Sequence, residues 1–85
     1  MEMKNTQLRK IGGRIMESKK LKATLMILEN TGRFTKTFLK NKRELTEQEI
    51  AYLINEEYII LCGTNAVNEK LYCISQKGKE FWRNM

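Results

Sequence analysis

The chain contains 85 residues, of which 41% are hydrophobic and 31% are charged, and its formal net charge is +6. A chain of this length forms one small domain, which excludes functions that need two lobes, and its composition is that of a globular protein rather than a disordered one. Because so small a domain is only marginally stable on its own, we expect it to form a homodimer.

The residue types also limit the chemistry. Histidine is absent and there are two cysteines, so one chain can assemble neither a four-ligand zinc cluster nor a Cys–His nucleophile. No glycine-rich phosphate loop is present, and we expect a protein without catalytic activity, metal or cofactor. The sequence has no apolar run near the ~18 residues of a membrane-spanning helix and no apolar core of a signal peptide, so we expect no membrane association and a cytoplasmic location.

Charge is segregated along the chain. Residues 1–43 contain twelve basic and three acidic side chains, residues 44–69 contain six glutamates and no basic side chain, and residues 70–85 are basic again. Such a polarity indicates one surface suited to a polyanion and another that is not.

The first segment, residues 1–17, has two interpretations. Leu8, Ile11 and Ile15 have helical spacing, but Gly12–Gly13 interrupts the pattern. The segment is therefore either a short helix that needs a partner or a basic N-terminal arm, whose cations include Arg9, Lys10 and Arg14.

The first long helix is predicted from residue 18 to residue 30. Leu21, Leu25 and Leu28 form an apolar stripe at helical spacing, Ser18 is a candidate N-cap, and Gly32 supplies a stop signal.

A short helix is predicted next, ending near residue 42. Thr35 can cap it, and Phe34 can pack on Leu39 as a hydrophobic staple. A short strand over residues 33–35 is the competing interpretation of its start.

A third helix is predicted from Thr46 to about Glu56. Thr46 and Glu49 have the spacing of a capping box, and Leu45 and Ile50 can form a staple around it.

Two strands and a final helix complete the chain. Residues 58–62 and 71–74 are rich in β-branched and aromatic side chains, and the polar segment 63–70 between them predicts a hairpin with a long tip. Ser75 is a candidate cap for a short closing helix over residues 76–83.

This order of elements resembles a winged helix-turn-helix DNA-binding domain. The residues that carry the resemblance are LTEQEIAYLINEEYIIL (45–61) and LYCISQKGKEF (71–81), which look like the third helix entering the wing and the returning wing strand entering the closing helix. The resemblance implies an α+β winged-helix domain over residues 18–85, with a three-helix core, a β-hairpin wing and a short closing C-terminal helix. It also implies a third helix in the DNA major groove and a wing at the adjacent backbone or minor groove.

The candidate third helix, however, carries Glu47, Glu49, Glu56 and Glu57 and no lysine or arginine. Phosphates repel such a helix, so we expect binding of double-stranded DNA mainly through backbone phosphates contacted by neighbouring segments, in a transcriptional regulator. The candidate nucleic-acid-binding residues are Arg33, Lys36, Thr37, Lys40, Lys42, Arg43, Asn65, Asn68 and Lys70, with Arg9, Lys10 and Arg14 of the arm as further contacts.

Two other functions remain open from sequence. One is a protein-interaction adaptor whose contact surface is Glu47, Tyr52 and Glu56 on the acidic helix, and the other is RNA binding through the arm and the basic helix. The cysteines also have two interpretations, because Cys62 and Cys73 either oppose each other across the hairpin and form a disulfide or remain reduced thiols that fill space.

Overall fold

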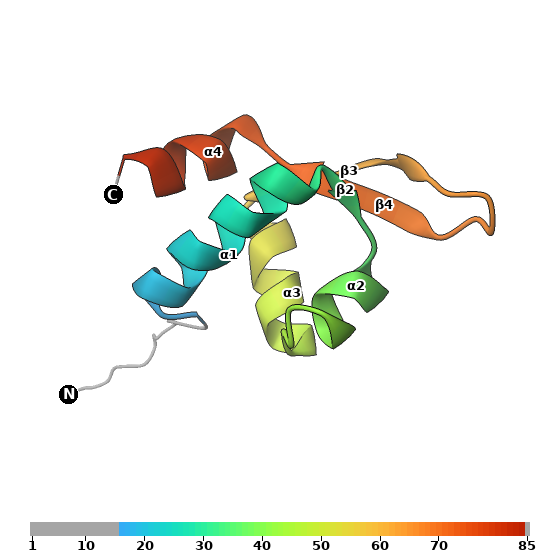
Figure 1. The fold of residues 1–85 in the computed structure, drawn as a ribbon, viewed down its shortest axis with the longest axis horizontal. Coiled ribbons are helices and arrows are strands. Elements are labelled where there is room, and N and C mark those ends of the chain that lie inside the picture. The colour runs from blue at the N-terminus through green and yellow to red at the C-terminus, as the bar shows by residue number, and fades with distance from the viewer. Residues whose placement is uncertain (1–15, 85) are drawn as a thin grey trace.

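In the computed structural model, which describes residues 16–84, the helices pack with a small antiparallel sheet in an α+β arrangement (Figure 1). The predicted arm residues Arg9, Lys10 and Arg14 lie outside the described residues. In chain order the elements are α1 (Ser18–Thr31), β2 (Arg33–Phe34), α2 (Lys36–Asn41), α3 (Glu47–Asn55), β3 (Ile59–Thr64), β4 (Lys70–Ile74) and α4 (Gln76–Arg83).

The three described strands form one antiparallel sheet in the order β2–β4–β3. β2 lies beside β4 with Phe34 opposite Tyr72, while β3 lies on the other side of β4 with Ile59 opposite Ile74. Both interpretations of the segment after α1 therefore hold, because a two-residue strand directly precedes the cap of α2. In Figure 1 the β3–β4 hairpin, which we name the wing, projects away from the helices.

Local hydrogen bonds at three helix starts confirm the predicted caps. The Thr35 hydroxyl accepts from the Phe38 N–H at 3.0 Å, and the Ser75 hydroxyl accepts from the Gly78 N–H at 3.0 Å. Thr46 and Glu49 form the complete capping box. These bonds satisfy backbone donors that have no partner inside a helix, so each helix start is fixed by residues within a single turn.

The predicted cap of α1 is wrong by one residue. Glu17 is the N-cap and makes no side-chain capping bond, while Ser18 is already helical. The Leu21 N–H donates to the Glu17 carbonyl at 2.8 Å, which closes the first turn around Ser18. The C-terminal prediction is confirmed, since Gly32 follows the helix at φ 88°, a conformation that favours glycine.

The core lies between the helices and one face of the sheet. The predicted stripe of α1, Leu21, Leu25 and Leu28, is buried together with Leu39 of α2 and Leu53 of α3. Met16 is also buried, so packing of the domain begins before α1. Because apolar burial is the main stabilising term in a domain of this size, these contacts fix the relative placement of α1, α2 and α3.

The wing strands contain a bulge that corrects the expected pairing of the cysteines. Ile60, not Cys62, lies opposite Cys73, and the register shifts between Leu61 and Gly63. The extra residue of the bulge displaces Cys62 from a directly opposed position, and both cysteines are free thiols. The predicted direct opposition of Cys62 and Cys73 is therefore wrong, and the structure holds no bond between the two sulfur atoms.

Candidate nucleic-acid interface

Strand β2 and helix α2 carry the first predicted cations. Arg33 on β2 and Lys36 and Lys40 on α2 are exposed. The Thr35 cap holds the start of α2, and below it the rings of Phe34 and Phe38 lie 6.4 Å apart. Buried aromatic contacts on one side of the segment thus direct its charged side chains toward solvent.

Helix α2 is joined to the base of the wing. The Thr37 hydroxyl donates to Glu69 Oε2 at 3.0 Å, and Lys36 Nζ lies 6.0 Å from the centroid of the Tyr72 ring. Lys70 directly follows Glu69 and is exposed. These contacts bring together predicted residues from α2 and the wing that are more than thirty positions apart in sequence.

The wing tip has a defined conformation in which Asn65 serves the backbone. Its Oδ1 accepts from the N–H groups of Val67 at 3.0 Å and of Glu69 at 2.9 Å. Asn68 is exposed and adopts a left-handed backbone conformation with φ 67°, which asparagine tolerates. Asn68 and Lys70 are thus presented to solvent, whereas Asn65 stabilises the turn that presents them.

The other predicted cations lie at the far end of α2. Lys42 is its C-cap and is exposed, while Arg43 is half-buried in the loop before α3. Lys40 forms an ion pair with Glu47 of α3 at 2.6 Å. The predicted cations therefore divide into two groups. Arg33, Lys36 and Lys70 lie on the side of the wing, and we call them the wing-side cations. Lys40, Lys42 and Arg43 lie at the end of α2 and in the loop before α3.

The acidic character of the α3 segment is largely balanced in space. Three of its glutamates pair with lysines of three other helices: Glu47 with Lys40 of α2, Glu49 with Lys20 of α1, and Glu56 with Lys77 of α4. The segregation of charge along the sequence is thus replaced by alternating charges around α3.

The ion pairs also affect the titration of the glutamates. The hydrogen bond from Lys40 is the main cause that lowers the pKa of Glu47. For Glu49, burial acts to raise the pKa, but the hydrogen bonds from Lys20 and from the Thr46 N–H outweigh burial and lower it. Both carboxylates are therefore charged at neutral pH and contribute to holding α3 in place.

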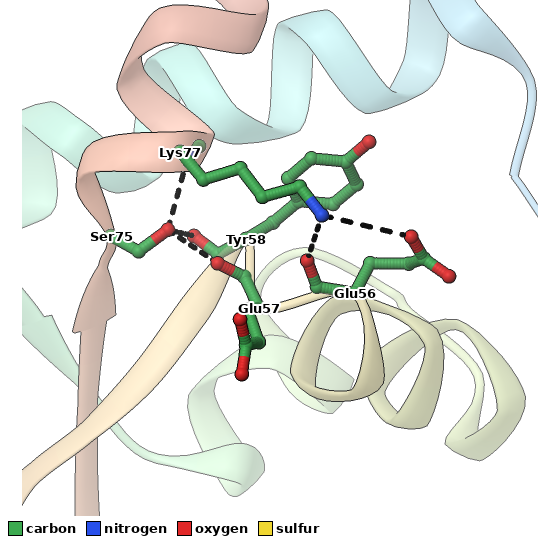
Figure 2. A network of polar contacts seen from close by, with 6 residues as sticks. Glu56, Glu57, Tyr58, Ser75 and Lys77 are labelled. Atoms are coloured by element: carbon green, nitrogen blue, oxygen red, sulfur yellow. Dashed lines mark hydrogen bonds and ion pairs between the residues drawn. The ribbon is translucent and has the colours of Figure 1, made fainter.

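The end of α3 is tied to the start of α4 by the network in Figure 2. Lys77 Nζ donates to the Glu56 carbonyl at 2.6 Å and lies 5.0 Å from the centroid of the Tyr58 ring. The Ser75 hydroxyl approaches the carbonyl oxygens of Glu57 and Tyr58. Sequence reasoning missed the roles of Lys20 and Lys77, because no local signal identifies partners 29 and 21 positions away.

The alternative protein-interaction surface is already engaged within the chain. Glu47 and Glu56 are in the ion pairs described above, and Tyr52 is half-buried with its ring 6.1 Å from that of Tyr58. The exposed side chains of α3 include Gln48 and Asn55. Gln and Asn can hydrogen-bond base edges in a DNA groove, so α3 presents polar groups outward in spite of its glutamates.

The remaining features of residues 16–84 concern metal ligation, a surface hollow and membrane crossing. No group of three His, Cys, Asp or Glu side chains in this region could hold a metal ion. A shallow hollow of about 410 Å³ is lined by Tyr58, Lys77, Glu80, Phe81 and Asn84. None of the helices in this part of the chain is long and apolar enough to cross a bilayer.

Comparison of the chain with protein-family models, curated proteins and solved structures found no match.

Proposed function

We propose that this protein is a winged helix-turn-helix protein that binds duplex DNA, largely through phosphate contacts, and acts as a transcriptional regulator. The observation that carries the proposal is the arrangement of the elements. Helix, short helix, helix, hairpin and closing helix follow one another, and the hairpin extends beyond the helical body beside α2 (Figure 1).

The wing-side cations supply the electrostatic support for this proposal. Arg33, Lys36 and Lys70 are exposed, and none of them forms an ion pair with a carboxylate among residues 16–84. Cations at the edge of a protruding hairpin are suited to a phosphate backbone, whose neutralisation releases condensed counterions.

The balanced charge of α3 removes an objection to the same proposal. An isolated helix with four glutamates would be repelled by DNA, but lysines of α1, α2 and α4 lie against three acidic side chains of the α3 segment. The exposed side chains of Gln48 and Asn55 then give α3 a polar surface that can approach a groove.

A titration of fluorescent duplex DNA at several salt concentrations tests the proposal. If about five phosphates are neutralised, the logarithm of the binding constant should fall with the logarithm of salt concentration with a slope near −4 to −5. The Arg33→Ala/Lys36→Ala variant should reduce the magnitude of that slope by about 2, and Lys19→Ala, which removes an exposed cation of α1, should leave it nearly unchanged. An affinity that does not respond to salt would contradict the proposal.

Reversal of a glutamate separates DNA binding from the adaptor function. Glu47→Lys releases Lys40 and adds a cation beside α2, so it should strengthen DNA binding more than Glu80→Lys, the same charge change on α4. An adaptor that uses the acidic helix would instead show no DNA binding with either variant. Competition between duplex DNA and structured RNA in the same titration identifies the preferred nucleic acid.

A further inference from the structure

The tip of the wing, residues 65–69, lies beyond the strand pairing and is organised by one side chain. The last paired residues of β3 and β4 flank this segment. Within it, the Asn65 N–H donates to the Glu69 carbonyl at 2.9 Å, and Asn65 Oδ1 accepts from the N–H groups of Val67 and Glu69. The conformation of the tip therefore depends on where the Asn65 side chain is held.

The carboxylate of Glu69 connects this tip to helix α2. Its Oε1 accepts from Asn65 Nδ2 at 3.4 Å, and its Oε2 accepts from the Thr37 hydroxyl at 3.0 Å. We call these two hydrogen bonds the Glu69 bridge. Within residues 16–84, the bond to Thr37 is the only hydrogen bond between the tip and a helix. The bridge thus links α2, through two side chains of the wing, to the backbone N–H groups of the tip.

Glu69 is an isolated acid among basic and neutral residues. It is the only acidic residue between Tyr58 and Ser75, and the segment from Arg33 to Arg43 contains none. No ion pair joins it to a lysine or arginine in the part of the chain that the structure describes. A carboxylate at this place repels phosphates, so it weakens a DNA-binding surface unless its hydrogen bonds contribute more than its charge costs.

We propose that Glu69 is a positioning residue, which holds the wing tip against α2 and thereby fixes the spacing between cations of the two elements. Lys36 directly precedes Thr37 on α2. Lys70 directly follows Glu69 on the wing, so loss of the bridge changes the distance between the two lysines. Thr37 then acts through Glu69, and its hydroxyl is not the phosphate contact predicted from sequence. The effect on DNA affinity rests on the proposed function, whereas the coupling of α2 to the tip is a property of the free protein.

Hydrogen exchange of the free protein, followed by NMR, tests the coupling without DNA. Thr37→Val nearly keeps the shape of the side chain but removes its hydroxyl. This variant should speed exchange of the Val67 and Glu69 N–H groups about fivefold, which corresponds to the loss of one ordinary hydrogen bond. Thr37→Ser, which retains a hydroxyl, should restore rates near those of the wild type. The Leu25 N–H inside α1 should exchange at the wild-type rate in each variant, which verifies that the fold is intact.

A double-variant cycle in DNA titrations tests the consequence for binding. Glu69→Ala removes a charge that repels phosphates, so it should strengthen binding if charge alone matters, whereas the inference predicts binding about fivefold weaker. Thr37→Val should weaken binding by a similar factor on its own but should add no further loss to Glu69→Ala, because both changes break the same bridge. Glu80→Ala, the same charge change at an exposed residue of α4, is the matched control and should leave the affinity nearly unchanged.

The two experiments separate failure of the inference from failure of the proposed function. A wild-type protein that binds no DNA contradicts the proposed function, and hydrogen exchange then decides whether Glu69 couples α2 to the tip. Unchanged exchange of Val67 and Glu69 in Thr37→Val would overturn the inference, and so would stronger DNA binding by Glu69→Ala. A full effect of Thr37→Val in the Glu69→Ala variant would also overturn it, because Thr37 would then contact phosphate directly.

Discussion

Replacement of Gly78 by alanine should destabilise the protein, although alanine is the better helix former. A Cβ atom at Gly78 would lie 2.4 Å from the Tyr58 carbonyl oxygen and 2.7 Å from Ile74 Cγ1. The Tyr58 carbonyl cannot move freely, because it accepts hydrogen bonds from the Ser75 N–H at 2.9 Å and from the Ser75 hydroxyl at 3.1 Å. Gly78 therefore permits α4 to approach the start of β3.

The magnitude follows from three opposing contributions. Overpacking costs about 1–3 kcal/mol, and a weakened hydrogen bond to the Tyr58 carbonyl costs about 1 kcal/mol. The higher helix propensity of alanine returns about 1 kcal/mol. We expect a net loss of about 2 kcal/mol in the free energy of unfolding, which corresponds to a decrease of roughly 8–16 °C in Tm for a domain of this size.

Urea denaturation followed by circular dichroism measures this loss. Gln76→Ala, at an exposed residue of the same helix, is the matched control and should change stability by less than about 0.5 kcal/mol. A Gly78→Ala variant as stable as the wild type, or more stable, would refute the reasoning, since helix propensity would then outweigh the close approach of α4 to Tyr58.

Four further outcomes are expected. Thr46→Ala should lower the free energy of unfolding by about 1 kcal/mol, measured by urea denaturation, because it removes the acceptor of the capping box. The pKa of Glu49 is lowered in the folded protein, so the stabilising contribution of its carboxylate is complete above its ordinary pKa of 4.5 and is lost as the pH falls through the lower folded value. In acid denaturation, the stability difference between the wild type and Glu49→Gln should therefore shrink below pH 4.5. A difference that stays constant with pH would contradict this. Leu25→Ala should cost about 2–5 kcal/mol in the same denaturation assay, because Leu25 is fully buried. Burial is the main cause that raises the pKa of Cys73, and the neighbouring Cys62 thiol raises it further. Because the thiolate is the reactive form, Cys73 should react with iodoacetamide more slowly at pH 8 than an unhindered model thiol. Equal rates, measured by mass spectrometry, would show that burial does not protect Cys73.

The local hydrogen-bonding signals were read correctly from sequence. The caps at Thr35, Thr46 and Ser75 and the stop at Gly32 each depend on residues within one turn of the helix end. The predicted cap of α1 is wrong because the true N-cap, Glu17, makes no side-chain capping bond, so its residue type does not mark the start of the helix. The hairpin was also predicted, but its bulge at Cys62 was not, since register depends on both strands together.

The candidate site was predicted only in part. The sequence identified the cations of β2 and α2, yet it did not indicate that Lys40 would pair with Glu47 or that Thr37 would bond to Glu69 of the wing. Those contacts join residues from separate elements, and side-chain type alone does not specify which of several lysines will face a given glutamate.

The amino-acid sequence by itself determined the caps of α2, α3 and α4, the stop at Gly32 and the buried stripe of α1, because caps, apolar periodicity and turn residues act over a few positions. Only the tertiary structure decided how charge is distributed over the surface. Folding places lysines of α1, α2 and α4 against the acidic α3 segment, so a chain whose charges are separated in sequence becomes a domain in which they alternate in space. The physical reason is that Coulomb interactions depend on distance in the folded molecule and not on separation along the chain.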